Sequence, residues 1–154
     1  MRNLVAGAVL ALGIAGSAGL PAQELSAEDA SLAAQTRQSV FRLLAWNMAP
    51  MAQMLSNERP FDQDRIALSA ERIHYLASMI SEAFDADTRS ADVDTEARDL
   101  IWDNRPDFAD KAAGLAAAAE VLGAAVESGE RGGILRSIAG VGRACGACHD
   151  VYRE

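Results

Sequence analysis

The chain has 154 residues and carries 14 basic against 22 acidic residues, a net charge of −8. A charge this negative argues against nucleic acid and anionic membranes as partners. Both cysteines and one of the two histidines fall within residues 145–149, which concentrates nearly all of the soft-ligand chemistry in one short segment.

Residues 1–22 have the pattern of a secretory signal peptide. The basic Arg2 precedes an apolar stretch of about 12 residues that ends in small residues. This stretch is shorter than the ~20 residues that a membrane-spanning helix needs, and a polar, acidic segment follows it. We therefore expect export to the periplasm, with cleavage after Ala22 or, as the alternative, after Ala18. Cleavage leaves residues 23–154 as one domain, with a net charge of −9 and no membrane insertion.

The first half of this domain predicts two long helices. Ser26 is a suitable N-cap, and apolar residues recur at helical spacing as far as the breaker cluster 56–60. Pro50 lies inside this pattern and predicts a kink or a local opening of the helix. A second helix is expected from near Asp62 to Ala83.

The second half predicts a long connection and two more helices. Residues 85–96 are acidic and lack periodicity, so they form the connection. The third helix covers the alanine-rich stretch 108–126, after a start signal at Pro106. The fourth carries apolar residues at alternating steps of four and three, which is the packing period of a helical bundle: Ile134, Ile138, Val141, Cys145, Cys148 and Tyr152. The sequence predicts an all-α, antiparallel (up-down-up-down) four-helix bundle.

Cys145, Cys148 and His149 are the candidate site. On a helix the two thiols point to one face and the imidazole lies on its flank. A disulfide is one alternative, although it closes a very short loop and leaves His149 unexplained. A zinc site is another, although it needs a fourth ligand that only His74 offers.

A covalent haem satisfies every constraint on this segment. Two thiols one helical turn apart can form thioethers to the porphyrin, and His149 then reaches the iron as an axial ligand. Cys-x-x-Cys-His is the attachment signature of c-type haem. Attachment follows export, in agreement with the signal peptide, so we expect one haem c bound through Cys145 and Cys148.

Two stretches resemble the class II c-type cytochromes, specifically the cytochrome c′ family. Residues 145–153 are similar to that family's ending, Cys-x-x-Cys-His-x-x-Tyr/Phe-Arg/Lys, and residues 36–41 are similar to its first-helix Arg-Gln-Ser segment. Weaker similarities occur at residues 83–84 and 101–103. The family fold is a four-helix bundle with covalently bound haem, and the resemblance spans nearly all of residues 23–154.

The resemblance implies roles for three more residues. Arg153 would lie beside His149 on the proximal face of the haem, and Arg37 would lie near a haem propionate. Phe41 would take the position of the bulky apolar residue over the distal face of the iron. A phenyl ring cannot ligate iron, so Phe41 implies five-coordinate iron with an apolar sixth site that admits nitric oxide or carbon monoxide.

We expect a gas-binding carrier of single electrons whose redox partner is unknown. The resemblance implies that it forms a homodimer through its first two helices. No constellation typical of an enzyme is evident in the sequence. A low-spin, six-coordinate electron carrier with a first-helix methionine ligand is the alternative, and a non-haem metal-binding or disulfide-stapled helical module is another. We expect the first-helix methionines to be packing residues: Met48, Met51 and Met54.

Overall fold

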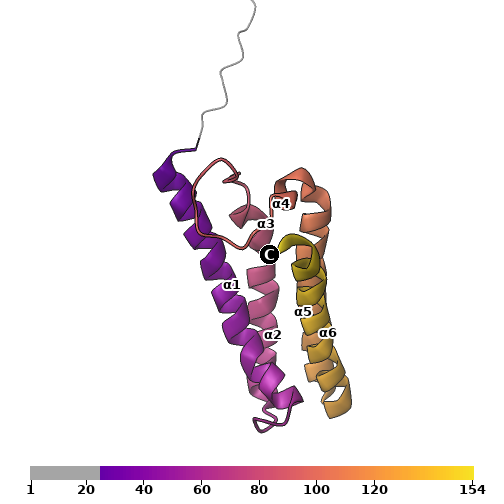
Figure 1. Ribbon diagram of the computed structural model, residues 1–154. Coiled ribbons are helices and arrows are strands. Elements are labelled where there is room, and N and C mark those ends of the chain that lie inside the picture. Colours follow the sequence, from indigo (N-terminus) through magenta and orange to yellow (C-terminus); the bar gives the residue numbers. More distant parts are fainter. Residues whose placement is uncertain (1–24) are drawn as a thin grey trace, which may run out of the picture.

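The computed structural model describes residues 25–154, and the signal peptide predicted at residues 1–22 lies outside them. The described chain is helical apart from its turns, one long connection and an isolated antiparallel bridge between Ala97 and Arg153. Figure 1 shows the long helices α1, α2, α5 and α6 running side by side, with the short helices α3 and α4 at one end. This is the predicted four-helix bundle.

Helix α1 spans Ala27–Leu55. Its N-terminus is capped by Ser26, whose hydroxyl accepts a 3.1 Å hydrogen bond from the backbone N–H of Asp29. The helix continues through Pro50 without a break, so the local opening predicted there is wrong. Proline removes a single N–H, and the buried residues around it hold the helix in place, among them the fully buried Met51.

Helices α2, Gln63–Ser78, and α3, Ile80–Ala83, together replace the single second helix predicted from the sequence. The cap residue Asp62 accepts a 2.9 Å hydrogen bond from the backbone N–H of Arg65. The break falls at Met79, whose N–H bonds three residues back, to the carbonyl of Leu76. This tighter turn ends the α-helical ladder.

Helices α4, Leu100–Asp103, and α5, Arg105–Ser128, follow the long connection. Pro106 lies within the first two positions of α5, as its fixed φ allows, so the predicted start signal is confirmed. The helix ends at Gly129, whose φ of 71° lies in the left-handed region that glycine adopts without strain.

Helix α6, Arg131–Tyr152, presents the predicted seam to the interior. Ile134, Ile138 and Val141 are fully buried, and Tyr152 is 3% exposed. The helices form a closed ring in which α2 packs on α1 and α5, and α6 packs on α5 and α1. No helix within residues 25–154 is long and apolar enough to cross a membrane.

Candidate functional site

A cavity of about 670 Å³ lies between α1, α5, α6 and the connection from α3 to α4. Its volume falls within the roughly 300–1,000 Å³ of small-molecule and cofactor sites. Aliphatic and aromatic side chains from every one of these elements line its wall, including Leu44, Phe84, Phe108, Leu115 and Val141. The cavity is therefore largely apolar and sized for one flat cofactor.

Cys145, Cys148 and His149 all line this cavity. They lie within the last two turns of α6, on the side of the helix that continues the buried seam. Both cysteines are free and half-buried. The predicted clustering of two thiols and an imidazole on one helix face is confirmed.

The electrostatics of the three groups follow from burial. Removal from water raises the pKa of both thiols, and for Cys148 the nearby Lys111 partly opposes this effect. Burial, and then the positive charge of Arg153, lower the pKa of His149 against the opposing charges of Asp150 and Glu96. The neutral imidazole is thus favoured, and it is the form that binds a metal.

Arg153 lies at the mouth of the cavity, one turn beyond His149. Its Nε donates a 2.6 Å hydrogen bond to the Glu96 carboxylate, and its Nη2 pairs with the same oxygen. Glu96 belongs to the segment that the sequence predicts to be a connection without a helix. That segment has no periodicity, so no pattern in it indicated a contact between Glu96 and Arg153. The ion pair is a feature that sequence reasoning missed.

Phe41 lies on the cavity wall contributed by α1 and is half-buried. Its ring meets that of Phe84 edge to face, with the centroids 6.2 Å apart. Phe84 is 3% exposed and also packs on Phe108, at 4.9 Å. Three aromatic rings therefore form one continuous apolar section of the wall.

Arg37 also lines the cavity, but most of its guanidinium is engaged elsewhere. Nε donates to the carbonyl of Ala83, Nη1 to the hydroxyl of Thr88 and Nη2 to the carbonyl of Ala86. The group also stacks over the Phe84 ring, 4.7 Å from its centroid. Each terminal nitrogen of the guanidinium keeps one further N–H that could donate to a carboxylate. The contact between Arg37 and a haem propionate stays a prediction.

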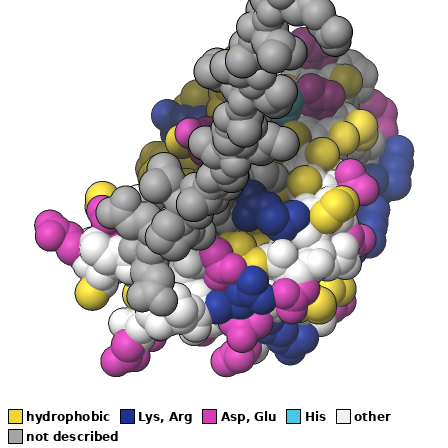
Figure 2. Space-filling model, turned by 90° about the horizontal axis from the view of Figure 1, so that it is seen from above, with side chains coloured by type: hydrophobic (Ala, Val, Ile, Leu, Met, Phe, Trp, Pro, Cys, Tyr) yellow, Lys and Arg dark blue, Asp and Glu magenta, His cyan; other side chains and the backbone are white. Residues whose placement is uncertain are grey.

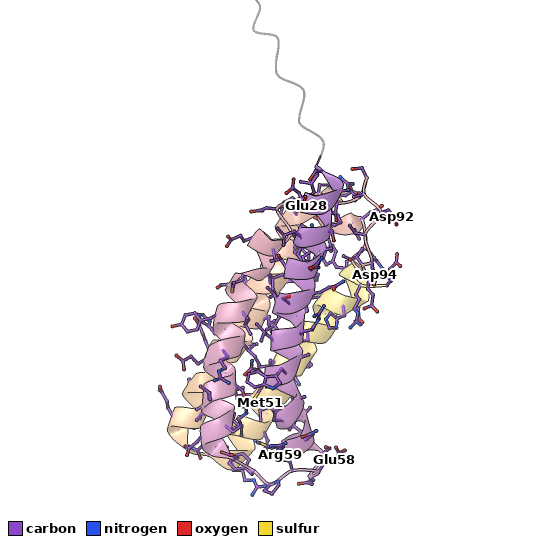
Figure 3. All side chains as sticks on the ribbon, turned by 90° about the vertical axis from the view of Figure 1, so that its left-hand side faces the viewer. Glu28, Met51, Glu58, Arg59, Asp92 and Asp94 are labelled. Atoms are coloured by element: carbon purple, nitrogen blue, oxygen red, sulfur yellow. The ribbon has the colours of Figure 1, made fainter. Side chains whose placement is uncertain are left out.

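The three methionines of α1 divide into two kinds. Met51 and Met54 are 0% and 3% exposed and do not line the cavity, so their predicted packing role is confirmed. Figure 3 labels Met51 on the lower half of α1. Met48 is half-buried and lies on the cavity wall, which the helical spacing alone did not distinguish.

The alternative ligand His74 lies away from the site. Its Nδ1 lies 3.4 Å from the carbonyl of Ala116 and 3.5 Å from the Glu120 carboxylate, between α2 and α5. It does not line the cavity with Cys145. Within residues 25–154 no three His, Cys, Asp or Glu side chains are placed to hold a metal ion, so the zinc alternative lacks its ligands.

Lys111 is a second cavity residue that the sequence reasoning missed. It lies on α5, and its side chain is 25% exposed, with Nζ 3.7 Å from the Asp107 carboxylate. It is the only lysine in the sequence. A lone lysine at helical spacing from Phe108 and Leu115 was the signal available to find it.

The lining as a whole fits a covalent haem c. The cavity offers a thiol pair one helical turn apart, an imidazole next to it and a wall that is mostly apolar elsewhere. Soft thiols and imidazole are the donor set of c-type attachment, and the apolar wall matches the porphyrin.

Comparison with known proteins agrees with this donor set. A family model described as cytochrome C′ matches residues 33–153. Cytochrome c′ from Halomonas halodenitrificans is 30% identical over 121 residues, covering 76% of this chain and 92% of that protein.

Two solved structures extend the agreement to the fold. Cytochrome c prime from Shewanella frigidimarina has a TM-score of 0.75 at 32% identity, covering 82% of this chain and 98% of that one. A nitric oxide complex of a variant of cytochrome c prime from Alcaligenes xylosoxidans has a TM-score of 0.70 at 28% identity, covering 83% and 96%. The chain belongs to the cytochrome c′ family, and its cofactor is covalently bound haem c.

Proposed function

We propose that this protein is a periplasmic, five-coordinate haem protein that binds nitric oxide or carbon monoxide and carries single electrons. The observation that carries the proposal is the convergence of Cys145, Cys148 and His149 on one apolar cavity. The thiols would hold the haem, and His149 would be the axial ligand of its iron. A bound haem c would supply one-electron exchange and an iron that can bind a gas.

The cavity wall supports the selection of uncharged gases. Phe41 and Phe84 offer no donor, acceptor or ligand atom, so the part of the wall that they form gives an anion no hydrogen bond in place of its hydration. Small neutral molecules are weakly hydrated and lose little free energy when they enter the cavity. A nitric oxide complex is known for a variant of the Alcaligenes xylosoxidans relative, which supports the same use of the cavity here.

A six-coordinate electron carrier is the second candidate function, and Met48 favours it. Met48 is the one methionine of α1 that lines the cavity, and methionine is a known axial ligand of haem. Phe41 lies on the same wall and favours the open site. The two candidates differ in whether a gas can bind the reduced protein without displacing a protein ligand.

Export and assembly complete the proposal. The signal peptide at residues 1–22 would be removed, leaving residues 23–154 as the mature domain. Exposed apolar side chains on α1 and α2 support a homodimer through these helices: Leu32, Leu43, Trp46, Leu68 and Tyr75. Figure 2 shows basic and acidic side chains interspersed on the uncovered part of one end of the molecule, rather than one patch of a single sign.

The absorption spectrum of the reduced, exported protein, with and without carbon monoxide, tests the proposal. A five-coordinate iron predicts a prompt spectral change on adding the gas, whereas a methionine-ligated iron predicts little or slow change. The mass of the purified chain should exceed that of the polypeptide by one haem. Protein made in cells that mature c-type cytochromes and recovered colourless at its bare polypeptide mass would contradict the whole proposal.

A further inference from the structure

The connection between α3 and α4 crosses the mouth of the cavity and is attached on both sides of it. Asp94, Thr95, Glu96 and Ala97 all line the cavity. On the side of α1, Gln38 Nε2 donates a 2.9 Å hydrogen bond to the carbonyl of Asp94. Figure 3 shows the connection that carries Asp92 and Asp94 lying beside α1, near the end of α6.

On the side of α6, the attachment is a short antiparallel pairing of backbones. The Arg98 N–H donates 3.0 Å to the Tyr152 carbonyl, and the Glu154 N–H donates 2.9 Å to the Glu96 carbonyl. The bridge between Ala97 and Arg153 lies between these two bonds. The backbone of Glu96 is therefore fixed against the residues that follow the haem-attachment motif.

This pairing directs the Glu96 carboxylate onto the Arg153 guanidinium. The Nε and Nη2 atoms of Arg153 share one oxygen of Glu96, with Nε at 2.6 Å. Both side chains are more than half exposed, and such ion pairs add little to stability. The backbone hydrogen bonds already hold residues 96–98 against the end of α6. The ion pair between Glu96 and Arg153 therefore matters mainly because it fixes the positions of two opposite charges.

We propose that Glu96 is a positioning residue that holds Arg153 at the cavity mouth beside His149 and offsets its charge, and thereby lowers the reduction potential of the haem iron. The inference rests on the proposed function, because it takes His149 as the axial ligand. A negative charge near the iron favours the oxidised state, which carries one more positive charge. An unpaired Arg153 would favour the reduced state.

The test measures the reduction potential of the holoprotein in wild type, E96Q, E96D and D92N. Asp92 is the matched control, since it is an exposed acid in the same connection that does not line the cavity. We expect E96Q to raise the potential clearly more than D92N does, and E96D to stay near wild type. Equal shifts in E96Q and D92N would overturn the inference, because Glu96 would then act only through net charge.

A double-mutant cycle with R153Q separates positioning from independent charges. If Glu96 acts through Arg153, the shift caused by E96Q should be smaller in the R153Q background than in wild type, since no guanidinium charge is then left for Glu96 to hold or offset. Additive shifts would overturn the positioning role. Far-UV circular dichroism confirms that each variant is folded.

The proposed function and this inference fail in different ways. A haem-loaded wild type in which E96Q behaves like D92N contradicts the inference alone. A wild type without covalent haem, or one whose spectrum is unchanged in a His149→Ala variant, contradicts both.

Discussion

The hydroxyl of Tyr152 donates a 2.7 Å hydrogen bond to the Asp107 carboxylate and so joins the last turn of α6 to the first turn of α5. Tyr152 is buried, and its ring packs edge to face on Phe108. Tyr152→Phe keeps the ring and removes only the hydrogen bond. We expect it to lower the free energy of unfolding by about 1.5 kcal/mol, as for hydrogen bonds to charged groups, measured by urea unfolding of the holoprotein. Tyr75→Phe, at an exposed tyrosine, should change it little.

The same contact predicts a dependence of stability on pH. Burial, and then the hydrogen bond to Asp107, raise the pKa of Tyr152 to about 12. An unfolded tyrosine loses its proton near pH 10, so between these values the folded state binds more protons than the unfolded one. This contribution is complete below about pH 10 and is lost as the pH rises toward about 12. Urea unfolding across this window should show a steeper decline for wild type than for Tyr152→Phe; parallel curves would contradict the assignment.

Phe41→Met tests which residue faces the sixth coordination position. The substitution places a thioether where the phenyl ring lies on the cavity wall, so we expect the ferric absorption spectrum to change from high-spin to low-spin and binding of carbon monoxide to weaken. Leu43→Met, two residues away and 47% exposed, is the control and should leave the spectrum unchanged. Identical spectra in wild type and Phe41→Met would show that Phe41 does not face the haem.

Substitutions at Met48 and Met51 test whether each methionine acts as a cavity residue or as a core residue. Met51 is fully buried in the core, and Met51→Ala should lower the free energy of unfolding by about 2–5 kcal/mol with the haem spectrum preserved. Met48 lies on the cavity wall, and Met48→Ala should instead alter the rate of carbon monoxide binding. Spectra and thermal unfolding of both variants check this division. A low-spin wild type that becomes high-spin in Met48→Ala would favour the six-coordinate alternative.

Arg37→Lys tests the guanidinium that binds residues 83–88. Lysine cannot reproduce three hydrogen bonds in different directions. We expect a loss of about 1.5–3 kcal/mol in the free energy of unfolding, as for hydrogen bonds to charged groups, and faster amide exchange in the segment that follows α3. Arg42→Lys, whose side chain bonds only within its own helix among the described residues, should change stability by no more than about 0.5 kcal/mol. Equal effects would contradict the bridging role.

Periodicity and short motifs predicted the bundle and the core of its site. Apolar residues from Ile134 to Tyr152 recur at alternating spacings of four and three residues. Because a helix has a fixed pitch, this spacing placed Cys145 and Cys148 on the interior face, and the adjoining imidazole of His149 followed from the same geometry. Helix starts at Ser26 and Pro106 were also predictable, since capping depends on the local sequence alone.

Contacts between distant segments could not be predicted in this way. Arg37 binds residues 46 to 51 positions away, and Glu96 meets Arg153 across 57 positions. Neither distance leaves a periodic signal in the sequence. The division of Met48 from Met51 depends on where α6 and the connection pass α1, which only the assembled bundle determines.

The position of Lys111 makes one wall of the cavity chemically addressable. Because the sequence contains no other lysine, an amine-selective reagent has a single side-chain target in the whole protein. That target is three-quarters covered and lines the same cavity as Cys145 and Cys148. The rate at which it is acylated therefore reports how accessible the interior is, in the loaded and the empty protein alike, without any added label.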